Sequence, residues 1–141
     1  MITLSKKQFE AIVNHARSCL PNEACGLLGG VVEGDKKIVK KVYILTNLDQ
    51  SPEHFSMEPK EQFGAVKDMR ANGWVLLGNW HSHPNSPSRM SEEDKRLAFD
   101  KKLSYLILSL AESEFVLNSF NIDGKQNVTT EELEIVDKAV I

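Results

Sequence analysis

Two histidines and an aspartate are spaced in the sequence so that they can hold a metal ion. His81 and His83 are separated by one residue and followed by Pro84, and Asp94 comes eleven residues after His83. Zinc sites with only three protein ligands keep a fourth position for water, whereas structural zinc sites are usually closed by four ligands. Zinc also lowers the pKa of such a water to about 7. The spacing therefore predicts a hydrolytic metal centre.

The backbone expected around these residues explains how they can meet. Residues 74–80 form a nearly continuous apolar run, which is typical of a central strand buried on both faces. The histidines come where this strand ends, and residues two apart in extended backbone point to the same side. Ser91 and Asp94 are three apart at the start of an expected helix that runs to about Lys102, so they share a face of that helix. A loop of residues 84–88 can fold the helix start back against the histidines.

Hydrolysis at such a centre needs a group that takes a proton from water and later gives it to the leaving group. The chain has 20 acidic residues, and most lie on expected polar faces or in turns. Glu23 differs because it precedes the apolar strand that starts at Cys25, and a carboxylate entering a buried strand needs a partner or a function. The sequence position alone does not decide between the two.

Each part of the pattern also has an ordinary structural explanation. Paired histidines occur in strands and loops without a metal, and Ser91 with Asp94 is also a sound capping box. The apolar strand around Cys25 favours a buried, unreactive thiol over a nucleophile. His15 lies on an expected helix, where a structural or surface role is the default, whereas His54 lies in a loop that could border a substrate groove. The combination of ligands after a buried strand favours the metal site.

The rest of the chain predicts helices and strands in alternation. Ser5 opens a first helix as part of a capping box, and Pro21 stops it. Residues 47–58 are expected to form a loop, after which Pro59 suits the first position of a second helix. That helix ends at Asn72-Gly73, and its expected apolar stripe consists of Phe63, Val66 and Met69.

Strands are expected, besides the run at 74–80, over residues 25–32, 38–45, 103–110, 114–121 and somewhere within 126–136. The first two form a hairpin pattern. The order α-β-β-α-β-α-β-β-β predicts an α/β protein with a mixed sheet flanked by helices. Neither an internal repeat nor a domain linker is visible, so a single domain over residues 1–141 is expected.

Composition narrows the function classes. The chain is 41% hydrophobic and 26% charged with a net charge of −3, which is ordinary for a soluble globular protein. A nucleic-acid-binding domain would show a basic stripe, and a membrane span needs about 20 apolar residues; neither is present. The N-terminus lacks a signal core, and two cysteines imply no disulfide framework. We expect a cytoplasmic protein without nucleic-acid or membrane partners.

Taken together, the singled-out positions resemble the motif of the JAMM (MPN-plus, Mov34) zinc metalloproteases. The five matching positions are Glu23, His81, His83, Ser91 and Asp94. Residues 21–29 (PNEACGLLG) and 78–84 (GNWHSHP) also look like this family. The resemblance implies a cytidine-deaminase-like α/β fold, made of one JAMM/MPN domain with one zinc ion at the edge of a mixed sheet.

The resemblance also implies a role for each of these residues. His81, His83 and Asp94 would bind Zn²⁺. Glu23 would deprotonate the attacking water and pass the proton to the departing amine. Ser91 would donate a hydrogen bond to the carbonyl oxygen as negative charge develops there, a contribution often worth several kcal/mol of barrier.

The chain looks most like small prokaryotic members of the family, because it has little room for the insertions that clamp ubiquitin in eukaryotic deubiquitinases. Those small members cleave after the diglycine tail of ubiquitin-like or sulfur-carrier proteins, and some release a cysteine joined to the carrier. The resemblance therefore implies a zinc-dependent peptidase or isopeptidase with such a carrier as its partner. The carrier, the type of amide bond and the formation of a homodimer stay open.

Two other functions remain compatible with the residues. MPN domains also serve as non-catalytic scaffolds for protein assembly, although those members have typically lost metal ligands. Two histidines and a carboxylate also bind iron in non-haem oxygenases. Such enzymes usually have all-β folds, whereas three helices are expected here.

Overall fold

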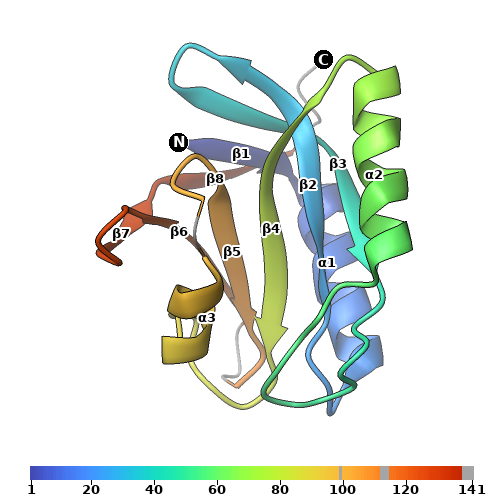
Figure 1. The fold of residues 1–141 in the computed structure, drawn as a ribbon, viewed down its shortest axis with the longest axis vertical. Coiled ribbons are helices and arrows are strands. Elements are labelled where there is room, and N and C mark those ends of the chain that lie inside the picture. The colour runs from blue at the N-terminus through green and yellow to red at the C-terminus, as the bar shows by residue number, and fades with distance from the viewer. Residues whose placement is uncertain (99, 112–114, 138–141) are drawn as a thin grey trace.

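The computed structural model describes residues 1–98, 100–111 and 115–137. Over these residues the chain forms eight strands in one sheet and three helices (Figure 1). The strands are β1 (Ile2–Ser5), β2 (Cys25–Glu33), β3 (Lys36–Leu45), β4 (Val75–His83), β5 (Ser104–Ser109), β6 (Val116–Ile122), β7 (Val128–Glu131) and β8 (Leu133–Val136); the helices are α1 (Lys6–Cys19), α2 (Pro59–Ala71) and α3 (Glu92–Leu97). None of the described helices is long and apolar enough to cross a membrane.

The sheet is mixed, and its strand order is β7-β6-β5-β4-β2-β3-β1-β8. β4 lies near the centre, antiparallel to β2 and parallel to β5. The predicted α/β class with a mixed sheet is therefore confirmed. Because β4 is central, the residues at its carboxyl end have a neighbouring strand on either side, which fixes their backbone from both directions.

Helices cover both faces of the sheet. α1 packs Ile12 and Ala16 against a core that includes Leu28 and Trp80. Leu27 points to the opposite face, since successive side chains alternate along a strand, and there it packs with residues of α2. A third cluster joins the two ends of α3 to β5 on that same face. His81 pairs with Cys25, two residues before Leu27, and so lies on the face that α2 and α3 share.

Two helices differ from their predictions. Met69 of α2 is buried, but Phe63 and Val66 are 67% and 36% exposed, because Ala65 and Met69, one turn apart, face the sheet instead. The predicted apolar stripe was therefore wrong at two positions. α3 ends at Leu97 rather than near Lys102. After it the hydroxyl of Tyr105 donates to the carbonyl of Asp100 at 3.0 Å and accepts from its amide at 3.2 Å, which holds a turn there.

The strands also differ in detail. β1 was not predicted, and the single strand expected within 126–136 is two strands, β7 and β8, on opposite edges of the sheet. β4 is not buried along its whole length, since Val75 and Leu76 are 53% and 36% exposed and point to opposite faces. The predicted hairpin is confirmed: β2 and β3 pair antiparallel around Gly34, whose φ of +62° suits a residue without a Cβ. Residue 114, at the start of another predicted strand, lies outside the described residues, and β6 begins at Val116.

Candidate active site

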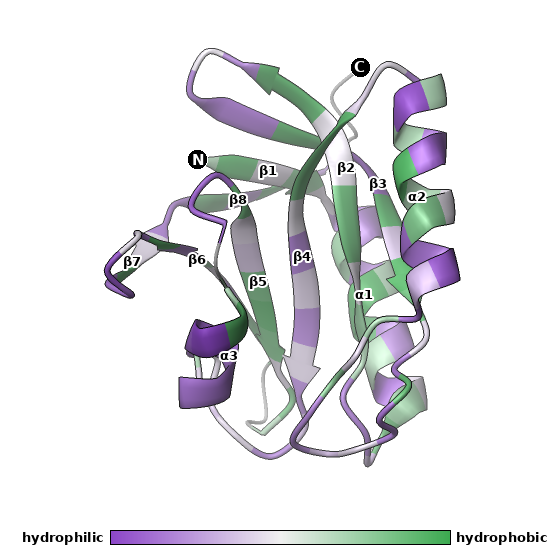
Figure 2. Ribbon diagram, in the orientation of Figure 1, coloured by the Kyte–Doolittle hydropathy of each residue, from purple (hydrophilic) through white to green (hydrophobic). Residues whose placement is uncertain are grey.

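Three of the predicted side chains meet at the carboxyl end of β4. The strand continues through His83, so both histidines belong to it rather than following it. His81 Nε2 lies 3.3 Å from Asp94 Oδ1, and His83 Nε2 lies 3.1 Å from Asp94 Oδ2 and 3.1 Å from His81 Nε2. Figure 2 shows hydrophilic segments along this half of β4, beside hydrophobic stretches of β2 and β5. The polar end of β4 is thus enclosed by apolar neighbours.

The start of α3 delivers Asp94 to the histidines. Ser91 is its N-cap: the Ser91 hydroxyl accepts from the Asp94 amide at 3.0 Å, and the Ser91 amide donates to Asp94 Oδ2 at 3.0 Å. The capping box is therefore real, and the same carboxylate also faces His83. The two interpretations of Ser91 and Asp94 are compatible, because the cap holds the carboxylate in place.

The arrangement of lone pairs fits a cation. His83 Nδ1 lies 2.9 Å from the carbonyl of Pro87, so this nitrogen donates and a neutral His83 carries its lone pair on Nε2. That lone pair points at the carboxylate of Asp94, which only accepts. Two acceptors 3.1 Å apart need a proton or a metal ion between them. Two imidazoles and one carboxylate within 4.8 Å of one another are a donor set that suits zinc; the metal itself stays a prediction.

The β2–β4 pairing explains why Glu23, far away in sequence, joins this cluster. Cys25 pairs with His81, and two hydrogen bonds continue the ladder: Ala24 donates to the Ser82 hydroxyl at 2.8 Å, and Ser82 donates to the Ala24 carbonyl at 3.0 Å. Continuing this register places Glu23 opposite His83. Sequence analysis did not single out Ser82. Its position between the two histidines, where its side chain points to the other face of the strand, could have indicated a contact with the neighbouring strand.

The Glu23 carboxyl is buried without a partner. Only 4% of the residue is exposed, and Oε1 has no hydrogen bond among the described residues. Burial raises the pKa of Glu23 to about 8, against a smaller opposing effect of the charge on His83. An unpartnered carboxyl beside a candidate metal site is free to bind a further molecule, such as water.

Charge at the site is shared unequally among the three clustered groups. Burial alone would raise the pKa of Asp94, but hydrogen bonds to His81 and His83 outweigh it and hold that pKa far below its ordinary range. Burial lowers the pKa of His81. Burial would also lower the pKa of His83, but the hydrogen bonds to Asp94 and Pro87 raise it overall. Asp94 therefore stays ionised, and a metal bound here would compete with protons for the histidine nitrogens.

The segment of residues 46–58 lies against the site and contributes side chains that sequence reasoning missed. The ring of Phe55 stacks on His81 with a centroid distance of 4.5 Å and an angle of 24°. His54 contacts Glu93 of α3 and lines, with Glu23 and Ser91, a cleft of about 470 Å³. His54 thus borders a cleft, as its loop position suggested.

A second cavity, of about 320 Å³, also reaches the cluster of candidate ligands. Its wall includes His81 and Asp94, and its apolar part consists of Phe55, Met57, Met90, Leu97 and Tyr105. The cluster is therefore reached through two openings. One is the cleft next to Glu23, which charged and polar residues line for the most part, and the other is a groove between the 46–58 segment and α3, which apolar and polar residues line together.

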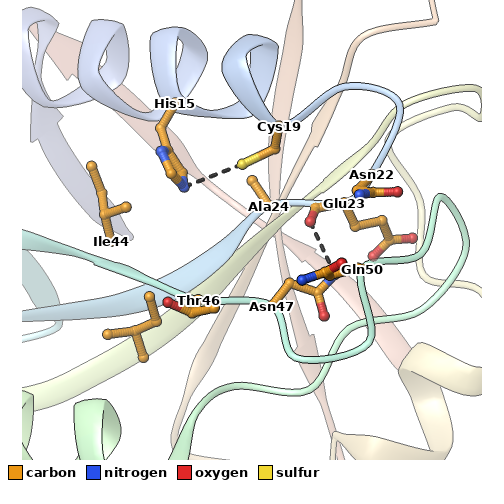
Figure 3. Close-up of a pocket in the computed structure, with 10 residues that line it drawn as sticks. His15, Cys19, Asn22, Glu23, Ala24, Ile44, Thr46, Asn47 and Gln50 are labelled. Atoms are coloured by element: carbon orange, nitrogen blue, oxygen red, sulfur yellow. Dashed lines mark hydrogen bonds between the residues drawn. The ribbon is translucent and has the colours of Figure 1, made fainter.

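Neither cysteine belongs to the cluster of candidate ligands, although Cys25 pairs with His81 across β2 and β4. Cys25 is fully buried, and burial raises the pKa of its thiol to about 12, which agrees with the expectation of an unreactive thiol. Cys19 Sγ lies 3.4 Å from His15 Nε2 in a separate cavity behind the Glu23 backbone. In Figure 3 the Glu23 side chain extends away from His15 and Cys19. His15 also packs edge-on against Trp80, so its structural role is supported.

Solved structures with the same fold confirm the class that this architecture defines. A JAB1/MPN domain protein from Archaeoglobus fulgidus is 23% identical and matches with a TM-score of 0.60 over 96% of this chain and 97% of that one. A solution structure of a Desulfitobacterium hafniense protein is 62% identical, with a TM-score of 0.89 over 98% and 94% of the two chains. The fold is that of the JAB/MPN proteins.

Sequence comparison identifies the family within that class. Residues 5–123 match the family described as prokaryotic homologs of the JAB domain. The chain belongs to this family, which confirms the predicted resemblance. It is 30% identical to the CysO-cysteine peptidase of Mycobacterium tuberculosis, over 91% of this chain and 86% of that protein. It is 27% identical to the desampylase of Haloferax volcanii, over 77% and 80% of the two chains.

Proposed function

We propose that this protein is a zinc-dependent peptidase or isopeptidase that hydrolyses the amide bond after the C-terminal diglycine of a ubiquitin-like or sulfur-carrier protein. The observation that carries the proposal is the convergence of His81, His83 and Asp94 within 4.8 Å, with the unpartnered Glu23 carboxyl beside them. Two similar proteins named CysO-cysteine peptidase and desampylase support a substrate of this kind.

In this proposal His81, His83 and Asp94 hold the metal. A zinc ion bound there would supply a Lewis acid that makes water easier to deprotonate. Pro87 fixes which nitrogen of His83 is available, through the hydrogen bond to Nδ1. Phe55 fixes the ring plane of His81 by stacking on it.

Glu23 moves the proton. Its carboxylate accepts a proton from the attacking water and hands it to the amine that leaves, which completes the hydrolysis of the amide bond. A group that must both take and give a proton works best with a pKa near the working pH, and burial moves Glu23 in that direction.

Ser91 stabilises the charge that develops on the substrate. Its oxygen accepts from the Asp94 amide, so its own proton is free to be donated towards the cleft that Ser91 lines. A hydroxyl there donates a hydrogen bond to the carbonyl oxygen as it becomes negative.

The two cavities suggest how the substrate lies. The groove beside Phe55 and Met57 accommodates the extended carrier tail, and the cleft beside Glu23 accommodates the leaving amine. Glycine at the last two tail positions lets the substrate backbone approach the metal ligands closely, because no Cβ intervenes.

The test is incubation with carriers that end in diglycine and are joined to cysteine, to a lysine side chain or to a short peptide, with mass spectrometry of the products. We expect cleavage directly after the second glycine, and none when that glycine is replaced by valine. An intact panel would favour the scaffold function. Metal analysis of protein purified without added metal separates the iron alternative, which requires stoichiometric iron and turnover that depends on oxygen.

A further inference from the structure

The side chain of Asn47, just after β3, uses its full hydrogen-bonding capacity. Its Nδ2 donates to the carbonyls of Glu23 and His54, both at 3.0 Å. Its Oδ1 accepts from the amides of Asp49 at 3.0 Å and Ser56 at 3.1 Å. A carboxamide has two N–H donors and two acceptor lone pairs. Because donors and acceptors are matched at both ends, the amide has one orientation only.

These bonds connect Glu23, which precedes β2, to the 46–58 segment that lies against the site. Figure 3 shows the bond from Asn47 to the Glu23 carbonyl at the wall of the cavity next to His15 and Cys19. The Glu23 amide donates in turn to the Ser51 carbonyl at 2.8 Å. Both backbone groups of Glu23 are therefore held by the 46–58 segment, so the Glu23 side chain starts from a fixed backbone position.

The same segment also contacts the metal ligands. Asn47 binds the carbonyl of His54, and the next residue, Phe55, stacks on His81. One amide thus ties the backbone of the proton-transferring residue to the residue that orients a metal ligand. Its donors perform this connection, whereas its acceptor oxygen bonds only within the segment, to Asp49 and Ser56.

We propose that Asn47 is a positioning residue that sets the Glu23 carboxyl relative to the metal ligands. The expected effect on catalysis rests on the proposed function. The expected effect on the position of the Glu23 backbone does not, because it depends only on the hydrogen bonds of Asn47. Displacement of a reacting group by about 1 Å can cost about a hundredfold in rate. Loss of the hydrogen bonds from Asn47 to the carbonyls of Glu23 and His54 therefore has a large effect without removing any group that touches substrate.

Two substitutions separate positioning from simple stability. Asn47→Ala removes all four bonds. Asn47→Asp keeps one oxygen that accepts from the amides of Asp49 and Ser56. Its second oxygen replaces the Nδ2 group and cannot donate to the carbonyls of Glu23 and His54. A matched control is Asn121→Ala, because Asn121 is also half-buried and its amide donates to a backbone carbonyl, that of Leu103 at 3.4 Å, in the β6 region.

The experiment measures amide hydrogen exchange by NMR on the zinc-loaded protein, together with kcat and KM on a cleaved carrier. The Glu23 amide donates to the Ser51 carbonyl, in the segment that Asn47 holds against Glu23. We therefore expect this amide to exchange at least about tenfold faster in both Asn47 variants. The Asp49 and Ser56 amides become less protected in Asn47→Ala only. In both variants kcat falls about a hundredfold, with KM within about threefold and zinc stoichiometry unchanged; Asn121→Ala matches wild type in all of these.

Unchanged exchange of the Glu23 amide in Asn47→Asp overturns the inference whatever the activity. Normal kcat together with faster exchange also overturns it, because the backbone would then be free without consequence. If the wild-type protein cleaves no carrier, the proposed function fails instead, and the exchange measurement still decides whether Asn47 holds Glu23.

Discussion

Two clusters of buried polar side chains lie on this sheet, and they differ in how completely their hydrogen bonds are made. The Lys37 cluster comprises Lys37, Ser104, Ser119 and Glu131 and lies at the amino end of β5. Lys37 Nζ donates to the carbonyls of Leu77 and Lys102 at 3.3 and 2.8 Å and to the Ser104 hydroxyl at 2.8 Å. Ser104 and Ser119 then donate to Glu131 at 2.6 and 2.8 Å. Every donor of the ammonium has an acceptor.

The cluster at the carboxyl end of β4 is less complete. Glu23 Oε1 and His81 Nδ1 are buried without partners among the described residues, and three lone-pair groups face one another. An unpaired buried polar group costs about 1–3 kcal/mol, so such an arrangement persists in a fold only with a ligand or a function. The contrast teaches that unmet hydrogen bonds, rather than buried polarity itself, distinguish the candidate active site from the Lys37 cluster.

Glu23→Gln is expected to have the largest effect. The amide keeps the size of the carboxyl but cannot take up a proton, so kcat should fall about a thousandfold while zinc content is unchanged. Glu53→Gln, in the wall of the same cleft, is the matched control and should stay near wild type. Similar rates for the two variants would remove Glu23 from the mechanism.

Loss of a ligand should affect metal binding before anything else. Asp94→Ala and His81→Ala are each expected to weaken zinc binding at least about a hundredfold, because two ligands cannot close a zinc site. Competition with a chromogenic chelator measures this affinity. Glu93→Ala, next in sequence but outside the three-residue cluster, should keep full zinc content; full occupancy in Asp94→Ala contradicts the ligand assignment.

The incomplete cluster should also make the stability of the metal-free protein fall as the pH rises from mildly acidic to about 8. The pKa of Glu23 is raised from 4.5 to about 8 in the folded state. Folding therefore favours the protonated carboxyl: the stabilisation is full below pH 4.5 and is lost as the pH rises through 8. We expect a loss of up to about 5 kcal/mol across that window, measured by urea unfolding. In Glu23→Gln the free energy of unfolding should depend much less on pH over this range. An equal dependence in the variant and the wild type would show that Glu23 is not the group responsible.

The smallest effect is expected at the Lys37 cluster. Lys37→Met leaves three acceptors without a donor, and the free energy of unfolding should fall by about 1 to 2 kcal/mol. Zinc affinity and kcat at a temperature where both proteins are folded should stay unchanged. A loss of kcat in Lys37→Met without a loss of folded protein would show that the Lys37 cluster also contributes to function, which would contradict the comparison.

Local patterns predicted much of the fold because they depend on neighbours in sequence. The capping boxes at Ser5 and Ser91 and the β2–β3 hairpin occur where expected. The stripe on α2 failed because periodicity shows that a face is apolar without showing which residues the sheet covers; Phe63 stays exposed. α3 ends at Leu97, before the turn that the Tyr105 hydroxyl holds at Asp100, and helix periodicity alone did not show this end.

The sequence by itself determined the kinds of groups at the site and the elements that carry them. The types and spacing of His81, His83 and Asp94 indicate a metal centre because strand and helix geometry are local. Only the tertiary structure decided what surrounds them. Pairing of β2 with β4 places Glu23 opposite His83, and the 46–58 segment brings Asn47 and Phe55 to the same place. Strand register and burial arise from contacts between distant segments, and those contacts left Glu23 Oε1 buried with no partner in the part of the chain that the structure describes.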